Sequence, residues 1–389
     1  MNLSGSLGVG YWSSDRQLDD KTHYTPLTLW LKMSANPGGG WYVRGEGWAV
    51  DERPFQKNIR VHSDLREGFI GWRNETTEFT LGRRIISWGR ADRINPTDVI
   101  NARDYTRLFP EDEQQKLGGT AVTLSHAFGA ATVTALWLPE FRASIYPIPP
   151  VSGLSFRQGA DRFEPDQMAV RLDYTGNNLD WSVTYFRGLN RNPAARVEQI
   201  STTAIAIGSV YNRMQVVGAD FASTLRGFGL RGEAAYTQSA VSGDTVFSPR
   251  SFLKTVVGVD RDLTRGLNVN AQYVFQQVFA YADPARGPDF TLNQIAIKTS
   301  LLNNQRLRIQ HGPAVRIGYT ALNDTLTLEV SALAFLSDGS YAVRPRATYA
   351  LTDHVRLIAG ADVFRGTQDS YFGQLQKNTL FFSEIQYSF

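Results

Sequence analysis

The sequence contains no cysteine and no long run of apolar residues. The absence of cysteine excludes a disulfide framework, thiolate metal sites and thiol catalysis. No stretch of 18 or more consecutive residues is apolar, which excludes an ordinary transmembrane helix. Basic and acidic residues nearly balance, with 40 Lys and Arg against 37 Asp and Glu. No basic run approaches a binding tract, so nucleic acid is not expected as a partner.

Aromatic residues are plentiful, and apolar residues alternate with polar ones in many segments. The 389 residues include 22 Phe, 16 Tyr and 8 Trp. In the C-terminal segment, Ile385, Tyr387 and Phe389 fall on one face of an extended chain, and polar residues fall on the other. This period of two predicts β-strands that each have one apolar face and one polar face.

The predicted strands are joined by connections of two alternating lengths. Short turns occur near 35–39, 176–178, 264–266, 322–324 and 351–354. Longer polar connections lie near 13–24, 51–59, 89–117, 140–166, 188–212, 240–250, 280–290 and 366–377. Outer-membrane barrels have short periplasmic turns and long external loops, so the pattern favours a barrel over a soluble sandwich. In lipid the sheet must also close, because every backbone polar group must bond within the protein.

The sequence therefore predicts an all-β protein, a closed antiparallel transmembrane β-barrel that forms a single domain over 1–389. The predicted strands lie near 2–12, 25–34, 40–50, 60–73, 77–88, 118–128, 131–139, 167–175, 179–188, 213–225, 229–239, 252–262, 266–279, 314–322, 325–336, 341–350, 354–364 and 378–389. These are 18 strands, and periplasmic N- and C-termini require an even number. One further strand at 291–302, with a partner, would make 20, and the failure of two weak strands would leave 16.

The predicted fold places the protein in the Gram-negative outer membrane. The chain starts directly with a strand-like segment and lacks the basic and apolar regions of a signal peptide. We therefore expect the mature form of an exported protein whose signal peptide is absent. Expected partners are outer-membrane lipid and lipopolysaccharide, and the barrel-assembly machinery, which would read the C-terminal strand ending in Phe389.

The alternation predicts that many charged side chains face the lumen. These residues are Arg44, Glu46, His62, Asp64, Arg66, Arg84, Arg171, Asp173, Arg231, Glu233, Lys254, Arg316, Glu329, Arg344, Arg346, Arg356 and Asp362. Four arginines, at 316, 344, 346 and 356, fall on neighbouring strands and could form an electropositive wall that guides anionic solutes. They could equally form ion pairs that brace the wall, because Glu329 and Asp362 lie on adjacent strands.

The long connection at 89–117 is the most distinctive segment, and a loop of this length is often functional. In general porins an external loop folds into the lumen and sets the constriction, and this segment could do the same. Its charged residues would then face the pore: Arg90, Asp92, Arg93, Asp98, Arg103, Asp104 and Arg107. The alternative is a cap that packs outside the barrel mouth.

A sequence pattern in this region resembles that of a known protein family. Its elements are Gly82-Arg83, Ser87-Trp88-Gly89, Ile94-Asn95-Pro96 and Asp98, followed by Leu136-Trp-Leu-Pro139 with Phe141. Over residues 81–141 the chain is similar to an outer-membrane family of unknown function that is often encoded beside RND-type exporters of lipids or hydrophobic compounds. The resemblance implies motif positions at Arg83, Trp88, Asn95, Pro96 and Asp98, and a possible inner-membrane transporter partner, but it names no substrate.

The remaining features do not indicate catalysis. The chain has five histidines, and no Ser–His–Asp arrangement, metal cluster or cofactor motif stands out, so no enzyme activity, metal or cofactor is expected. The apolar loop 141–167 could bind an apolar ligand or pack on the barrel mouth. The expected function is an outer-membrane channel for passive or substrate-specific diffusion of small or medium solutes, with anions favoured. The alternative is a conduit for hydrophobic compounds, lipid or polysaccharide that works with an inner-membrane transporter.

Overall fold

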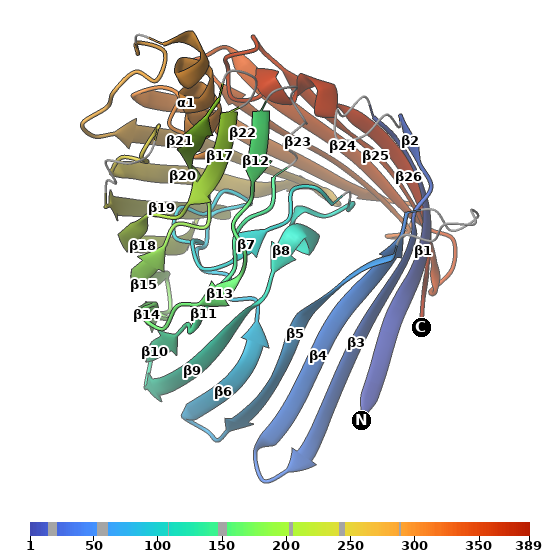
Figure 1. Ribbon diagram of the computed structural model, residues 1–389. Coiled ribbons are helices and arrows are strands. Elements are labelled where there is room, and N and C mark those ends of the chain that lie inside the picture. The colour runs from blue at the N-terminus through green and yellow to red at the C-terminus, as the bar shows by residue number, and fades with distance from the viewer. Residues whose placement is uncertain are drawn as a thin grey trace.

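A computed structural model shows a closed β-barrel (Figure 1). It describes residues 1–14, 22–52, 61–107, 109–146, 154–201, 205–240, 246–287 and 289–389. The main sheet has 19 strands, which are 18 barrel strands and the two-residue strand β2. Barrel strands adjacent in sequence pair in antiparallel fashion, and β1 closes the barrel by pairing with β26 from Ser6–Ser388 to Ser14–Leu380.

The barrel strands are 7 to 13 residues long, a length suited to a tilted strand that crosses a bilayer. In chain order they are β1 (Asn2–Ser14), β3 (Leu27–Gly38), β4 (Trp41–Asp51), β5 (Val61–Arg73), β6 (Thr77–Arg84), β9 (Gly119–Phe128), β10 (Ala131–Trp137), β14 (Met168–Tyr174), β15 (Leu179–Leu189), β18 (Arg213–Leu225), β19 (Phe228–Ser239), β20 (Phe252–Thr264), β21 (Leu267–Val278), β22 (Ile309–Ala321), β23 (Leu326–Phe335), β24 (Ser340–Ala350), β25 (Val355–Arg365) and β26 (Leu380–Ser388). The prediction of 18 antiparallel strands is confirmed.

The smaller elements belong to the connections. They are β2 (His23–Tyr24), β7 (Ala102–Arg103), β8 (Lys116–Leu117), β11 (Glu140–Phe141), β12 (Leu154–Arg157), β13 (Arg162–Phe163), β16 (Ala194–Ile200), β17 (Ile205–Val210), the α-helix α1 (Phe290–Leu302) and the 3-10 helices η1 (Asp112–Gln115) and η2 (Gly373–Asn378). Strands β12, β17 and β16 form a small separate sheet.

The suggestion of a further strand at 291–302 is wrong, because this segment forms helix α1. The carboxylate of Asp289 caps the helix by accepting a hydrogen bond from the backbone N–H of Leu292. Ile295 and Leu301 are buried, and Ile295 packs in one cluster with Ala195 and Ile207 of the small sheet. The helix therefore forms on the loop side, where tertiary contacts cover its apolar residues.

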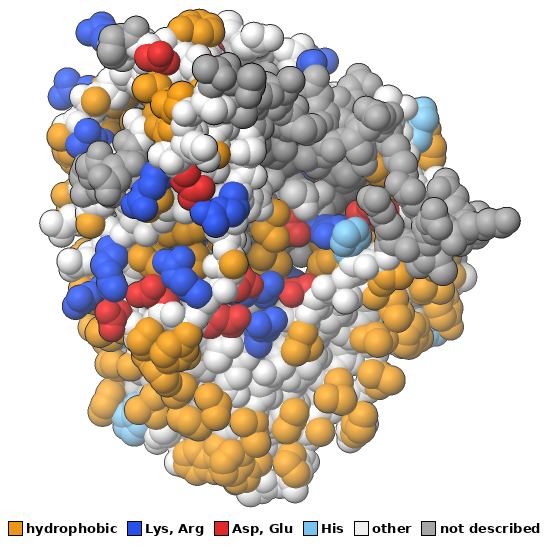
Figure 2. All heavy atoms as spheres, viewed as in Figure 1, with side chains coloured by type: hydrophobic (Ala, Val, Ile, Leu, Met, Phe, Trp, Pro, Cys, Tyr) orange, Lys and Arg blue, Asp and Glu red, His pale blue; other side chains and the backbone are white. Residues whose placement is uncertain are grey.

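The two faces of the barrel wall differ as the alternation requires. Large hydrophobic side chains on the outward face stay exposed, including Val257 and Phe381, each at 62%. Figure 2 shows hydrophobic side chains gathered over the lower part of the barrel, with charged side chains concentrated above them. Such an exterior suits lipid rather than water. Among the described residues, no helix is long and apolar enough to cross a membrane.

The short turns and both termini lie at one end of the barrel (Figure 1). Several of these turns need a left-handed backbone, as at Gly129 (φ 63°), Gly227 (φ 80°) and Gly266 (φ 84°). Glycine adopts this conformation at no steric cost, which allows tight hairpins. The longer connections lie at the other end and in the interior, and the candidate site is built there.

Candidate functional site in the lumen

The connection between β6 and β9 makes contacts across the barrel interior. We call residues 85–118 the lumen segment; all of it except residue 108 is described. Arg90 binds Asp173 of β14 at 2.7 Å and also binds Asp220 of β18. Asp92 accepts a hydrogen bond of 2.6 Å from Nε of Arg316 on β22. These partners come from widely separated strands, so the segment spans the lumen rather than lying along one wall.

The ion pairs of Arg90 hold charge at a partly buried position. Burial of the guanidinium by itself would lower the pKa of Arg90. The hydrogen bonds and charges of Asp220 and Asp173 outweigh this effect and raise the pKa. Arg90 therefore stays charged, and Asp220, whose side chain is inaccessible to solvent, has a compensating partner.

The middle of the lumen segment folds around one buried carboxylate, that of Glu233 on β19. Its oxygens accept hydrogen bonds from N–H (2.6 Å) and Oγ1 (2.7 Å) of Thr97, from Nδ2 of Asn95 (3.1 Å) and from N–H of Ala91 (3.3 Å). Gly89 has φ of 102°, and a Cβ there would lie 2.5 Å from a Glu233 oxygen. Glycine at this position and Asn95 in the motif thus both serve the contact with Glu233.

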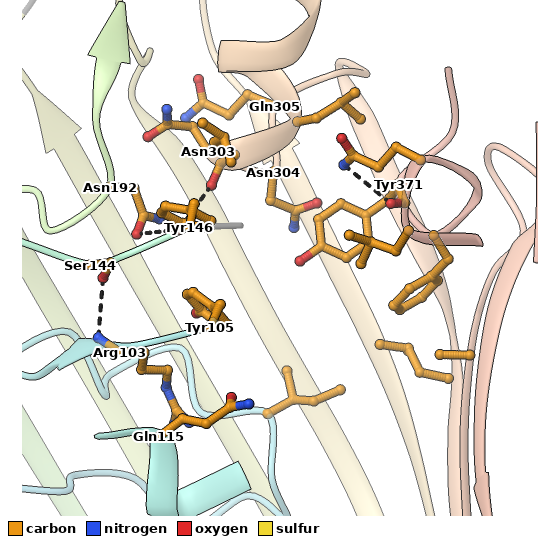
Figure 3. Close-up of a pocket in the computed structure, with 18 of the residues that line it drawn as sticks. Arg103, Tyr105, Gln115, Ser144, Tyr146, Asn192, Asn303, Asn304, Gln305 and Tyr371 are labelled. Atoms are coloured by element: carbon orange, nitrogen blue, oxygen red, sulfur yellow. Dashed lines mark hydrogen bonds between the residues drawn. The ribbon is translucent and has the colours of Figure 1, made fainter. Parts of the chain in front are cut away.

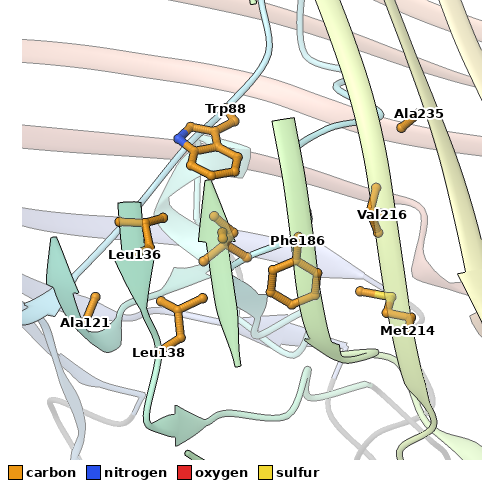
Figure 4. Packing of buried hydrophobic residues seen from close by; sticks show 10 residues of the cluster. Trp88, Ala121, Leu136, Leu138, Phe186, Met214, Val216 and Ala235 are labelled. Atoms are coloured by element: carbon orange, nitrogen blue, oxygen red, sulfur yellow. The ribbon is translucent and has the colours of Figure 1, made fainter. Parts of the chain in front are cut away.

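Trp88 attaches the start of the segment to the inner wall. Its indole is 8% exposed and belongs to a hydrophobic cluster with Leu136, Phe186 and Val216, which come from three strands (Figure 4). The guanidinium of Arg171 lies 5.9 Å from the centre of the Trp88 ring. The motif tryptophan therefore packs inside the barrel, where burial of a large aromatic side chain is stabilising.

Lys116 ties the two ends of the segment together. Its side chain is 3% exposed, and its ammonium group donates to Oγ of Ser87 at 2.6 Å and pairs with Asp98 and Glu113, both at 2.7 Å. A buried ammonium is stable when several oxygens surround it, as they do here. Asp98 also lies 3.7 Å from Arg103.

Arg83 and Glu140 form a separate contact at the rim of the barrel, 3.0 Å apart. The second oxygen of Glu140 accepts hydrogen bonds from N–H (2.9 Å) and Oγ1 (2.6 Å) of Thr120. Burial opposes ionisation of Glu140, but these hydrogen bonds, with Arg83 and Arg142, lower its pKa. The arginine of the motif therefore braces the loop that follows β10.

The lumen contains two described cavities. The loop-side cavity, about 1690 Å³, lies among the lumen segment, α1, η2 and inward faces of strands from β20 to β25. The turn-side cavity, about 430 Å³, is lined by residues of β19 to β23 and the turn residue Gly266. Asn270 and Arg316 line both cavities and are register partners on β21 and β22. Arg316 pairs with Asp92 of the lumen segment and lies 3.6 Å from Glu329.

The charge of the two cavities differs in sign. Nine Lys or Arg and five Asp or Glu residues line the loop-side cavity. Two Arg and three Asp or Glu residues line the turn-side cavity. Several loop-side arginines are paired, as Arg344 is with Asp362 at 2.6 Å. Among the described residues, Lys254, Lys298 and Lys377 have no ion-pair partner, which leaves a surplus of positive charge.

The fourteen residues that the sequence predicted for the pore fall into separate groups. Nine line one or both cavities: Asp92, Arg93, Asp98, Arg103, Arg107, Arg316, Glu329, Arg344 and Asp362. Three are used in ion pairs beside the cavities: Arg90, Asp104 and Arg346. Arg84 lies over the ring of Phe69 and donates to Thr80. Arg356 is exposed and has no ion pair in the described part of the chain.

Sequence reasoning missed four residues that matter to this site: Asp220, Lys116, Glu111 and Asn270. Asp220 and Asn270 could have been found, because alternation along β18 and β21 places both on the inward face. Lys116 and Glu111 belong to irregular backbone that carries no periodic signal. Lys116 pairs with Asp98 within the lumen segment, and Glu111 pairs with Arg346 of β24, so both roles depend on how the segment packs.

The histidines lie apart from one another, and each contacts different neighbouring residues. His62 lies 3.7 Å from Glu52, His126 contacts Thr77 at 2.8 Å, and His311 contacts Tyr273 at 2.6 Å. In the described ranges, no group of three or more His, Asp or Glu side chains could hold a metal ion. In the apolar loop 141–167, Phe156 packs against the cluster around Ile295, while the prolines at 147, 149 and 150 lie outside the described residues.

Comparison with known proteins places the fold. No family model matches the chain, and no curated protein matches it. Among solved structures, Acinetobacter baumannii OccAB3 has a TM-score of 0.57 at 9% identity, covering 100% of this chain and 98% of that one. Pseudomonas aeruginosa OpdL has a TM-score of 0.56 at 11% identity, covering 100% of this chain and 98% of that one. OccK8 (OprE) from the same organism has a TM-score of 0.56 at 12% identity, covering 100% of this chain and 97% of that one. The chain thus has the fold of a Gram-negative outer-membrane β-barrel.

Proposed function

We propose that the chain is an outer-membrane channel for passive or substrate-specific diffusion of small or medium solutes, with anions favoured. The observation that carries the proposal is the pair of lumen cavities that share Arg316 and Asn270 as lining residues. Solutes would pass between the barrel ends through this point. The lumen segment, with Asp92 and Arg93 beside Arg316, would form the constriction.

The preference for anions follows from the loop-side charge. The surplus of Lys and Arg raises the local concentration of anions in a narrow space with low-dielectric walls. Ion pairing reduces this effect without removing it, since among the described residues Lys254, Lys298 and Lys377 have no ion-pair partner. The bracing role and the guiding role that the sequence left open are thus both compatible with this lumen.

Single-channel recording in planar lipid bilayers tests the proposal. We expect a steady conductance, and a reversal potential under a salt gradient that shows anions to be more permeant than cations. Folding of the protein is verified by the change in its gel mobility on heating. The absence of any conductance from protein that is folded by this criterion would contradict the channel function. A cation-selective conductance would contradict the assigned preference only.

A second candidate function is a conduit for hydrophobic compounds, lipid or polysaccharide that works with an inner-membrane transporter. The resemblance to the family found beside RND-type exporters supports it, as does an aromatic wall of the loop-side cavity. There Phe335, Tyr371 and Phe372 pack together, with Phe364 beside them. Copurification of a periplasmic or inner-membrane component after crosslinking in cells would favour this function over an autonomous channel.

A further inference from the structure

The loop-side cavity is unusually rich in carboxamide side chains. Fifteen of its 60 lining residues are Asn or Gln, whereas the whole chain has 37 such residues among 389. Some of them build the wall, as Gln305 does by bonding N–H and C=O of Arg250. A carboxamide is both a donor and an acceptor, which matches a hydroxyl group of a ligand. The enrichment therefore points to a ligand with many hydroxyl groups.

Several of these amides retain hydrogen-bonding capacity toward the cavity. Asn270 is 4% exposed and, among the described residues, its amide has no hydrogen-bond partner; the same holds for the amides of Gln294 and Asn378. Gln115 and Gln158 donate to backbone carbonyls, at 3.1 and 3.0 Å, and leave their own carbonyl oxygens available. An apolar ligand would leave such groups unsatisfied at a cost in free energy, so the lining suits a polar ligand better than a hydrocarbon.

Tyrosine rings face the same space as the amides. Figure 3 shows Tyr105, Tyr146 and Tyr371 around the cavity, with Asn304 on one side and Gln115 on the other. The rings of Tyr105 and Tyr146 are stacked 4.9 Å apart, and Tyr105 is 40% exposed. An aromatic ring offers a flat apolar face beside a polar hydroxyl, and the alternating C–H and O–H groups of a sugar ring fit this combination.

The unpaired lysines of the cavity indicate that the ligand carries negative charge. Lys254 lines the cavity from β20 beside Gln276, its register partner on β21. In the described part of the chain no carboxylate pairs with Lys254, Lys298 or Lys377. A ligand with carboxylate groups would supply the missing partners, because hydrogen bonds between ionised groups are the stronger ones.

We propose that the loop-side cavity is a binding site for an acidic oligosaccharide, that is, a short chain of sugar rings with carboxylate groups. This inference rests on the proposed channel, because it names the solute class that the lumen would conduct. The volume of about 1690 Å³ exceeds the roughly 300–1,000 Å³ of sites for single small ligands, so several sugar rings fit.

Current block in planar bilayers tests the site. The probes are the trisaccharide of galacturonic acid and maltotriose, which has the same length and no charge. We expect the acidic trisaccharide to interrupt the single-channel current at about tenfold lower concentration than maltotriose, because charged hydrogen bonds are the stronger. Failure of both sugars to interrupt an existing conductance would overturn the site and leave the channel intact.

Three variants assign the block to the cavity. Lys254→Met is expected to weaken the block by the acidic sugar about tenfold and to leave that by maltotriose unchanged. Asn270→Leu is expected to weaken both about fivefold. Gln386→Met is the matched control, since Gln386 bonds Ser6 and does not line the loop-side cavity. A block that all three variants change equally would refute the assignment.

A barrel without conductance would contradict the proposed channel. Binding of the acidic trisaccharide to the cavity can be measured in that case too. Isothermal titration calorimetry of the same detergent-solubilised protein with the acidic trisaccharide gives the second readout. Binding that Lys254→Met weakens would support the site even if the barrel is closed. The absence of binding would overturn it.

Discussion

The two lumen cavities are bounded by the same wall yet differ in size, charge and composition. The turn-side cavity is small, mildly acidic and lined mainly by strand residues, whose direction follows from alternation. The loop-side cavity is larger, basic and amide-rich, and connections supply much of its lining. The difference teaches that the barrel provides a generic tube, while the chemistry of the site comes from segments that fold into it.

The largest effect is expected from Glu233→Ala, which removes the acceptor that holds the lumen segment to β19. Four donors of the lumen segment lose their partner, and we expect its local opening free energy to fall by about 3 kcal/mol. Hydrogen exchange at the N–H groups of Ala91 and Thr97 measures this change, and open-channel noise should rise. Unchanged protection of both amides would show that Glu233 is not the anchor; Glu233→Gln should give an intermediate result.

The preference for anions is expected to depend on Arg316, which lines both cavities. Arg316→Met leaves Asp92 and Glu329 without this cation at the junction, so the ratio of anion to cation permeability should fall roughly fivefold to tenfold. The reversal potential under a salt gradient measures the ratio. Arg356→Met is the control, because this arginine lines neither described cavity, and an equal shift in both variants would refute a local role.

Gly89→Ala is expected to loosen the same contact between the lumen segment and Glu233 to a lesser degree. The added Cβ meets the Glu233 carboxylate at 2.5 Å on a left-handed backbone, at a cost of about 1–3 kcal/mol. The readout is again hydrogen exchange at Thr97. Gly119→Ala should leave it unchanged, because a Cβ at Gly119 meets no atom within 4 Å.

The smallest effect concerns pH and should be confined to the loop end. The pKa of Glu140 is lowered in the folded protein, so its stabilising effect is present above the ordinary Glu pKa of about 4.3 and is lost as pH falls through the folded pKa. The opening free energy of the Thr120 N–H, obtained from its protection factor, should therefore decrease from about pH 5 downward, by less than about 1 kcal/mol. In Glu140→Gln the protection factor should not vary over this range.

Much of the fold could be predicted from the sequence, and the reason is the regularity of strands in a membrane. A period of two assigns each side chain to lipid or lumen, and this rule alone places Glu233, Lys254 and Arg316 inside the barrel. The helix α1 could not be predicted in the same way. Its apolar residues show no helical periodicity, and the cover that they receive comes from the distant β16 and β17.

The sequence by itself determined the closed barrel and the inward position of the charged residues, and it limited the number of strands to between 16 and 20, because local alternation and backbone satisfaction in lipid leave few other solutions. Only the tertiary structure decided that Asp220 pairs with Arg90, that Glu233 holds Asn95 and Thr97, and that Arg316 lines both cavities. Such pairings join residues more than a hundred positions apart. No local pattern encodes them, since they depend on how an irregular segment packs inside a finished wall.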